Sequence, residues 1–300
     1  MPLFSPAGGP FYLTLGEALD DSLLEISEVS ESGSVPELQV ENKADLPVLL
    51  LDGEELVGAK QNRVLNTTIL LKKQSTTTIP VSCTEQGRWS YTSPKFADSG
   101  HVMTPRSRLT KARSVHQSLS SLRSYRSDQG AVWDEVSDLQ ARADLHSPTG
   151  AMRDVYESRR EKLEKYCEAF PIAPDHNGLL VMIDGIAAGL DIVSRPEAFL
   201  RIGPKLIKSY AMEALLTRGA AKKKGTGERG LRFLERVVSA EGRSYRSVGH
   251  GQDHRFSSPH VVGSALTYRK TVIHAAFFPT DGTASNPEMR GPSRRRRYRY

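Results

Sequence analysis

The chain has 300 residues, of which 38% are hydrophobic and 25% charged, and its formal net charge is +6. This composition supports a folded core, unlike that of intrinsically disordered chains. Most of the charge lies at the end: residues 286–300 hold six arginines and one glutamate, a net of +5, which leaves +1 for residues 1–285. A nearly neutral body argues against nucleic-acid binding through a basic face of the folded part.

The two cysteines, Cys83 and Cys167, are too few for a disulfide framework and form no CxxC zinc motif. His250 and His254 have HxxxH spacing, but glycines on both sides predict a loop instead of the helix that this zinc motif requires. The N-terminus lacks a signal-peptide pattern, and no run approaches the ~18 apolar residues of a membrane span. We therefore expect a cytoplasmic protein with no membrane segment, no metal and no cofactor.

The first third of the chain predicts β-structure. Short apolar or alternating runs indicate strands at Pro36–Val40, Leu46–Leu51, Glu55–Leu65, Thr68–Lys73 and Thr76–Cys83. Asp52–Gly53 predicts a two-residue hairpin turn, because both positions of such a turn favour positive φ. Gln74–Ser75 is expected to connect the last two strands as a second hairpin.

The middle of the chain predicts helices after an irregular segment. Residues 93–130 are rich in serine, arginine and lysine and are expected to be an exposed, mobile basic connection. Periodic apolar residues indicate helices at Ala131–Ala143, Met152–Phe170 and Glu197–Leu216. Ser147–Pro148–Thr149 predicts a helix N-cap with proline at the first helical position. Asn177–Asp191 predicts a hairpin with Asp184–Gly185 as its turn.

The last part predicts a basic glycine-rich loop at 217–230, a helix or strand at Arg232–Val238 and a strand at Arg243–Gly249. A hairpin within Val261–Phe278 and a disordered arginine-rich tail at 281–300 follow. The order of strands, helices, hairpin, helix and strands indicates an α+β fold. We expect residues 1–280 to form one domain. In it the β-rich N-terminal section and the C-terminal hairpin form one sheet core, with helices inserted between them.

Four consecutive polar residues, Lys60, Gln61, Asn62 and Arg63, follow Gly58 near the end of a predicted strand. A half-buried strand alternates polar and apolar residues, so this segment faces either solvent or a polar cleft. Lysine and arginine beside two amides suit a phosphate or carboxylate ligand. A solvated surface strand and a ligand site are equally compatible with the pattern.

A second polar group follows the predicted strand that ends at Cys83. Strand alternation places Glu85 on the inward face at the rim of the core, where a carboxylate needs a partner such as Arg63 or Arg88. Glu85 is thus a structural ion-pair residue or a general acid–base group. Trp89 either caps the core or offers a stacking surface for a base or sugar. Cys83 is expected in the core.

Four segments together resemble one family. They are VLLLDGEELVGAKQNRVLN at Val48–Asn66, IPVSCTEQGRW at Ile79–Trp89, HSPTG at His146–Gly150, and VVGSALTYRKTVIHAAFF at Val261–Phe278. The resemblance is to the ARPP domain, a bacterial family named for its association with ADP-ribosylglycohydrolases and rhodanese-like phosphatases. It implies an α+β fold and a connection with ADP-ribose or nucleotide chemistry, without assigning a reaction.

The first functional hypothesis is a cleft for a small anionic or nucleotide-like ligand. Its ligand-binding residues are Lys60, Gln61, Asn62, Arg63, Arg88, Trp89 and Arg255, and its catalytic candidates are Glu85 and Asp253. Asp253 and Arg255 are included because a glycine-rich segment before the final hairpin can approach an anion. The alternative is a non-catalytic accessory domain in which these residues form internal salt bridges. A weaker alternative is nucleic-acid association through the Arg294–Arg297 tail.

Overall fold

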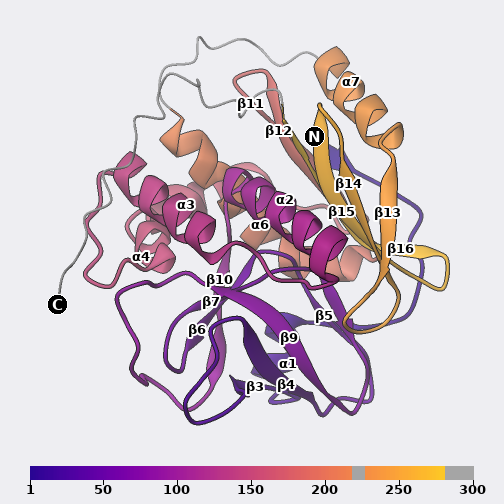
Figure 1. The fold of residues 1–300 in the computed structure, drawn as a ribbon. Helices are drawn as coiled ribbons and strands as arrows, with labels where there is room; N and C mark the ends of the chain where they lie inside the picture. Colours follow the sequence, from indigo (N-terminus) through magenta and orange to yellow (C-terminus); the bar gives the residue numbers. More distant parts are fainter. Residues whose placement is uncertain (218–226, 281–300) are drawn as a thin grey trace.

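The structure is a computed structural model that describes residues 1–217 and 227–280 (Figure 1). It confirms the α+β class, with the strands divided among three sheets. A six-stranded sheet has the order β10-β6-β7-β9-β4-β3, with β3 Leu24–Glu28, β4 Glu37–Asn42, β6 Glu54–Gly58, β7 Arg63–Leu65, β9 Ser75–Cys83 and β10 Phe96–Val102. A three-stranded sheet has the order β2-β5-β8, with β2 Leu13–Thr14, β5 Val48–Leu50 and β8 Ile69–Leu71.

The third sheet has seven strands in the order β1-β11-β12-β16-β15-β14-β13. Their bounds are β1 Pro2–Leu3, β11 Gly178–Ile183, β12 Ile186–Val193, β13 Gly242–Arg246, β14 Gln252–Ser257, β15 Val261–Tyr268 and β16 Thr271–Pro279. We expected the C-terminal hairpin β15–β16 to join the N-terminal strands in one sheet core. It pairs instead with β12 and β14. The β11–β12 hairpin has a free edge at β12, and β16 pairs with that edge in the antiparallel direction. The paired residues run from Leu190↔Phe277 to Val193↔His274.

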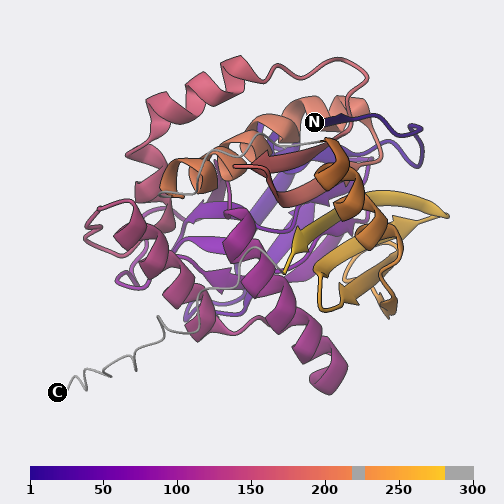
Figure 2. The same ribbon diagram turned by 90° about the horizontal axis from the view of Figure 1, so that it is seen from above.

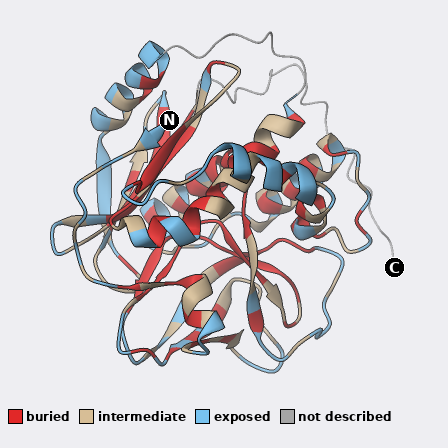
Figure 3. Cartoon of the chain, turned by 180° about the vertical axis from the view of Figure 1, so that it is seen from behind, coloured by how far each residue is buried: buried red, intermediate tan, exposed pale blue. Residues whose placement is uncertain are grey.

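Helices fill the space beside and between the sheets (Figures 1 and 2). They are α1 Leu15–Asp20, α2 Pro105–Leu122, α3 Gln129–Arg142, α4 Met152–Glu157, α5 Arg160–Ala169, α6 Pro196–Leu216 and α7 Gly227–Val238. α6 contributes Phe199, Ile202 and Leu206 to a buried cluster that also contains Leu70 of β8 and Ile273 of β16. This shared core joins the N-terminal strands to the seven-stranded sheet, and Figure 3 shows buried residues concentrated along that junction.

The prediction of an exposed connection at 93–130 is wrong, because this segment forms β10, all of α2 and the start of α3. α2 begins after the Thr104 N-cap, with Pro105 in its first turn. Its apolar residues are spaced three or four apart and are buried: Leu109, Ala112, Val115 and Leu119. The basic composition suggested exposure, but Arg108 and Lys111 are also buried, because acidic residues from other elements pair with them.

Two expected turns have different outcomes. Asp184–Gly185 is the expected hairpin turn of β11–β12, with φ of 49° and 76°. At Asp52–Gly53 only the glycine has positive φ, 85°, and the chain passes from β5 in one sheet to β6 in another. The expected hairpin is therefore a turn between sheets, and β8 and β9 likewise do not pair with each other.

The expected strand over Glu55–Leu65 is interrupted. β6 ends at Gly58, whose φ is 126°, and Ala59 has a φ of 40°, so residues 59–62 form a turn before β7. Lys60–Asn62 therefore do not alternate across a strand. The predicted helices at 131–143, 152–170 and 197–216 are present, the second as α4 and α5. α4 starts at Met152 without a side-chain cap, so the expected capping by Ser147 or Thr149 is wrong.

Two expectations concern residues that lie partly or wholly outside the described chain. The arginine-rich tail at 281–300 and residues 218–226 of the expected basic loop lie outside it, while Gly227–Gly230 begin α7. Within residues 1–217 and 227–280, no helix has both the length and the hydropathy needed to cross a membrane.

Candidate functional site

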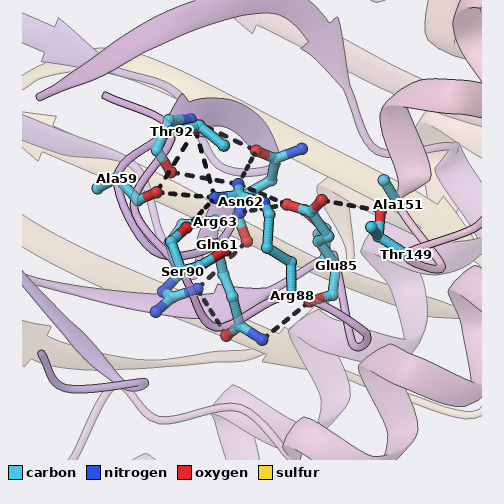
Figure 4. Close-up of polar contacts among 12 residues, drawn as sticks. Ala59, Gln61, Asn62, Arg63, Glu85, Arg88, Ser90, Thr92, Thr149 and Ala151 are labelled. Carbon is cyan, nitrogen blue, oxygen red and sulfur yellow. Dashed lines mark hydrogen bonds and ion pairs between the residues drawn. The ribbon is translucent and has the colours of Figure 1, made fainter. Parts of the chain in front are cut away.

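The turn between β6 and β7 is built around the guanidinium of Arg88 (Figure 4). This group donates to the carbonyl oxygens of Ala59 at 2.7 Å and Ser90 at 2.8 Å, and to the amide oxygen of Asn62 at 3.2 Å. It also donates to Glu85 Oε2 at 2.6 Å. Arginine has five N–H donors in a fixed fork, which suits it to hold several acceptors of a tight turn at once. Arg88 thus fixes the shape of residues 59–62.

Glu85 completes this scaffold from the other side. Its Oε2 also accepts the backbone N–H of Asn62 at 3.1 Å, and its Oε1 accepts the hydroxyl of Thr149 at 2.8 Å. Burial acts to raise the pKa of Glu85, but the hydrogen bonds from Arg88 and Thr149 outweigh it and hold the pKa below its usual value. A carboxylate with both oxygens occupied is suited to positioning the turn. The ion pair between Glu85 and Arg88, one of the two roles expected for Glu85, is present.

Gln61 and Arg63 connect the turn to the sheet. The Gln61 side chain donates to the carbonyl of Glu85 at 2.9 Å and accepts from Arg63 Nη1 at 3.0 Å. Arg63 is fully buried on β7, paired with Cys83 in the β7–β9 register. Its Nε and Nη2 atoms have no hydrogen-bond partner among the described residues. Burial lowers the pKa of Arg63.

A buried carboxylate that the sequence analysis did not select faces Arg63. Glu28 Oε1 lies 3.9 Å from Arg63 Nη2, and the Glu28 side chain is only 3% exposed. Both Glu28 oxygens lack hydrogen-bond partners in the described chain. Buried polar groups are rarely unsatisfied, so such a pair calls for a water or a ligand group. Leu24 and Ile26 are buried at alternate positions of β3, and that alternation was a signal that Glu28 points inward.

Exposed aromatic rings lie beside this pair. Trp89 is 48% exposed and Tyr91 is 51% exposed. Arg63 Cζ lies 5.6 Å from the Trp89 ring centroid, and Lys60 Nζ lies 5.5 Å from Trp89 and 5.0 Å from Tyr91. These cation–π distances place the two cations against the aromatic faces. Of the expected alternatives for Trp89, its exposure favours a stacking surface over a core cap.

A short turn covers the same place. Lys60 Nζ donates to the Glu31 carbonyl oxygen at 2.6 Å, and Tyr91 Oη donates to it at 3.4 Å. Gly33 has a φ of 77°, and an added Cβ there would lie 3.1 Å from Lys60 Cδ and 3.4 Å from both Glu28 Oε2 and a Trp89 ring carbon. The turn at 30–33 therefore closes over Arg63 and Glu28, held by one carbonyl.

Asp253 and Arg255, expected in the same cleft, belong to another cluster. On β14 they share one face, and Arg255 donates to Asp253 through Nε at 2.5 Å and Nη2 at 2.8 Å. Thr67 adds a hydroxyl that donates to Asp253 Oδ2 at 2.7 Å. The residues are 3% and 1% exposed, and both carboxylate oxygens are occupied. Their hydrogen bonds and ion pairs in the described part of the chain do not reach Lys60–Arg63.

A larger buried network lies next to that pair. Arg108 of α2 binds Asp191 of β12 with two hydrogen bonds, 2.9 and 2.8 Å, and approaches Asp52 at 3.5 Å. Lys111 pairs with Asp52 and donates to the carbonyl of Leu65 at 2.8 Å. These ion pairs join α2 to all three sheets, because Asp52 lies between β5 and β6, and Asp191 lies in the seven-stranded sheet.

His274 and Thr68 extend the network. His274 Nε2 lies 3.3 Å from Asp191 Oδ1, and its Nδ1 lies 2.8 Å from the Thr68 hydroxyl. This order of carboxylate, imidazole and hydroxyl is found in nucleophilic sites. Here Asp191, His274 and Thr68 are 0%, 1% and 4% exposed, so a substrate has no access to the hydroxyl. His274 is the satisfied core histidine that its apolar strand favours.

Cys83 is buried, and burial raises its pKa, which favours the unreactive thiol. The described residues contain no group of three or more histidine, cysteine, aspartate or glutamate side chains that could hold a metal ion. His254, one of the HxxxH histidines, bonds through its two ring nitrogens to Ser244 and Thr267 hydroxyls at 2.8 Å each.

The comparisons with known proteins agree with the resemblance carried by the sequence motifs. No curated protein and no solved structure matches the chain. The family described as the ARG and Rhodanese-Phosphatase-superfamily-associated Protein domain, ARPP-1, matches residues 1–278. These residues include every side chain of the Arg63–Glu28 site and of the buried network. The chain belongs to the ARPP-1 family.

Proposed function

We propose that the place formed by Lys60, Arg63, Glu28, Trp89 and Tyr91, here called the Arg63 site, binds a nucleotide or ADP-ribose-type ligand. The observation that carries the proposal is the pair of buried, oppositely charged side chains with unsatisfied polar atoms beside two exposed aromatic rings. The family's association with ADP-ribosylglycohydrolase, stated in its name, supports the same class of ligand.

Each part of such a ligand has a matching group in the site. Arg63 Nε and Nη2 are donors that suit phosphate oxygens, with Lys60 as a second cation. The Glu28 carboxylate accepts hydrogen bonds, which ribose hydroxyls donate. Trp89 and Tyr91 present rings on which a base can stack, an interaction worth ~1–3 kcal/mol per base in nucleic-acid complexes. A bare phosphate would leave Glu28 and the rings without a partner.

The covering turn sets how a ligand enters. Arg63 is fully buried, so residues 30–33 must move away before a phosphate can reach it. The turn is held to the site through the Glu31 carbonyl, which accepts from Lys60 and Tyr91. A phosphate that pairs with Lys60 competes directly with that carbonyl. Binding and opening of the turn are therefore coupled.

Glu85 and Asp253 remain predicted catalytic residues, and their occupied oxygens support structural roles. Gln61, Asn62 and Arg88 support the Arg63 site by shaping the turn that carries Lys60. The second candidate function, a non-catalytic accessory domain, is favoured by these internal ion pairs. Nucleic-acid association through Arg294–Arg297 stays a prediction.

The chain offers a direct optical test, because it has two tryptophans, Trp89 and Trp133. A Trp133→Phe variant makes Trp89 the single reporter of the Arg63 site. We expect ADP-ribose and AMP to change its fluorescence with saturation, whereas adenosine and inorganic phosphate bind at least about tenfold more weakly, a difference of about 1.4 kcal/mol. Saturating ligand should also stabilise the fold, by ~2.7 kcal/mol at 100 times its Kd.

Two further variants in the Trp133→Phe background separate the site from unspecific attraction. Glu28→Gln should weaken ADP-ribose but not inorganic phosphate, and Lys60→Met should weaken both. Lys72→Met, at an exposed lysine just after β8, serves as the control and should leave the titration unchanged. If none of these ligands alters Trp89 fluorescence or the unfolding temperature, the proposal is wrong and the accessory-domain function is favoured.

A further inference from the structure

A hollow of about 510 Å³ lies between α7, the turn of the β11–β12 hairpin and the end of β16. The residues that line it are different from those of the Arg63 site. Three arginines of α7 line it, namely Arg229, Arg232 and Arg236. Ile186, Ala187 and Phe233 provide an apolar wall. Among the described residues that line this hollow, none is acidic. The volume lies in the range of small-molecule pockets, roughly 300–1,000 Å³.

The arginines point to one side because of their spacing. Positions 229, 232 and 236 are three and four residues apart, which places them on one face of the helix. Phe233, 3% exposed, anchors α7 in a buried cluster with Leu180 and Phe277. Figures 1 and 2 show α7 alongside the C-terminal strands. The helix thus holds a row of cations over an apolar surface.

Arg229 and Arg232 make few interactions with the residues that the structure describes. Arg229 Nη1 donates to the Gly185 carbonyl at 3.0 Å, which directs it toward the hairpin turn. Arg232 lies 3.7 Å from Glu228, and their side chains are 65% and 81% exposed. Exposed ion pairs of this kind contribute roughly 0–1 kcal/mol. Arg232 can therefore exchange Glu228 for an anionic ligand at little cost.

The apolar surface continues past the arginines. A smaller hollow of about 120 Å³ shares Ile186, Ala187 and Pro279 with the first and adds Leu109 and Phe278. Ile186 is 51% exposed at the hairpin turn, between the two hollows. An isolated phosphate would use the arginines alone and leave these apolar walls in water.

We propose that the hollow beneath α7, here called the α7 hollow, binds an anionic amphiphile, a small molecule that joins a phosphate, sulfonate or carboxylate to an apolar body. Arg229 and Arg232 hold the anionic group with charge-assisted hydrogen bonds. Ile186, Ala187 and Phe233 cover the apolar body. Both parts are required, because exposed arginines alone attract any anion and an apolar wall alone attracts any hydrophobe.

Calorimetric titration with octyl phosphate on the full chain tests this, with octyl glucoside and inorganic phosphate as the neutral-head and chain-free probes. We expect octyl phosphate to bind with a Kd below about 1 mM, at least tenfold tighter than either control probe. Arg232→Gln should weaken octyl phosphate about tenfold without unfolding the protein, because its side chain is exposed. Ile186→Glu should abolish binding. The matched control is Arg201→Gln, at a 68% exposed arginine of α6, which should bind as the wild type does.

Three results would overturn the proposal. One is the absence of octyl phosphate binding by the wild type, and another is equal binding of octyl glucoside. The third is an unchanged Kd in both Arg232→Gln and Ile186→Glu, with the unfolding curves showing that both variants are folded. Loss of Trp89 response in the Arg63-site titrations has no bearing on these outcomes, since Trp89 does not line the α7 hollow.

Discussion

Asp191 gives the sharpest test of what holds the three sheets and α2 together. Its Oδ2 accepts Arg108 Nη1 at 2.9 Å and the Tyr210 hydroxyl at 2.7 Å, while its Oδ1 accepts Arg108 Nη2 at 2.8 Å. Asp191 and Arg108 are both fully buried. In Asp191→Asn, the one carboxylate that still pairs with Arg108 among the described residues is Asp52 at 3.5 Å, which Lys111 also uses.

The expected loss follows from the unpaired buried charge. Removing one partner of a buried ion pair destabilises a protein by roughly 3–5 kcal/mol, out of a total stability of about 5–15 kcal/mol. With a urea m-value near 3 kcal/mol per M, the midpoint should fall by ~1–2 M. Far-UV circular dichroism at pH 7 measures it. Asp138→Asn is the control, since Asp138 is 42% exposed and lies 3.5 Å from Arg106; we expect less than ~1 kcal/mol there.

A double variant tests the cause. Arg108→Met with Asp191→Leu removes both charges and should recover much of the stability that Asp191→Asn loses, because the penalty comes from the uncompensated charge. A midpoint for Asp191→Asn within about 0.3 M of the wild type would refute the reasoning, as it corresponds to only ~1 kcal/mol. Burial acts to raise the pKa of Asp191, but Arg108 outweighs it and lowers the pKa from 3.8 to about 2. This stabilisation is therefore present above pH 3.8 and is lost as the pH falls through about 2.

Three other predictions concern single residues. Burial raises the pKa of Glu55 from 4.5 to about 7, so the folded state retains a proton that the unfolded state loses; the free energy of unfolding should fall between pH 4.5 and 7, and Glu55→Gln should abolish that slope in urea titrations at several pH values. Gly58→Ala should destabilise the fold by more than Gly100→Ala. Both glycines have positive φ, but an added Cβ at Gly58 lies 2.6 Å from the Lys95 carbonyl oxygen, whereas no atom lies within 4 Å at Gly100; equal melting temperatures would contradict this. Arg88→Met should cost ~3–5 kcal/mol in chemical unfolding by leaving Glu85 buried without its cation, and a loss below 1 kcal/mol would count against its role in the turn.

Local patterns accounted for much of the secondary structure. The apolar residues of 131–143 and 197–216 recur at helical spacing and predict α3 and α6 correctly. Asp184–Gly185 was found for a local reason too, since its turn depends on φ values that glycine and aspartate tolerate. At 93–130 the local composition wrongly predicted exposure, because Arg108 and Lys111 pair with carboxylates that lie far away in the sequence and are buried with them.

In the candidate site too, local features were visible in the sequence, whereas long-range pairings were not. The polar character of Lys60–Arg63 and the presence of Glu85, Arg88 and Trp89 beside it were visible in the sequence, because each block is contiguous. The tertiary structure decided their roles: Arg88 and Glu85 satisfy each other and the turn, whereas Arg63 faces Glu28 across the sheet.

What the sequence determined by itself is the character of each local unit: the α+β class, the helices α3 to α6 and the polar blocks. Only the tertiary structure decided which charges meet, placing Asp253 with Arg255 and Thr67, apart from Arg63. The reason is physical. Hydrophobic periodicity and turn preferences act between near neighbours in the chain, but the partner of a buried charge is set by which sheet edges and helices pack together.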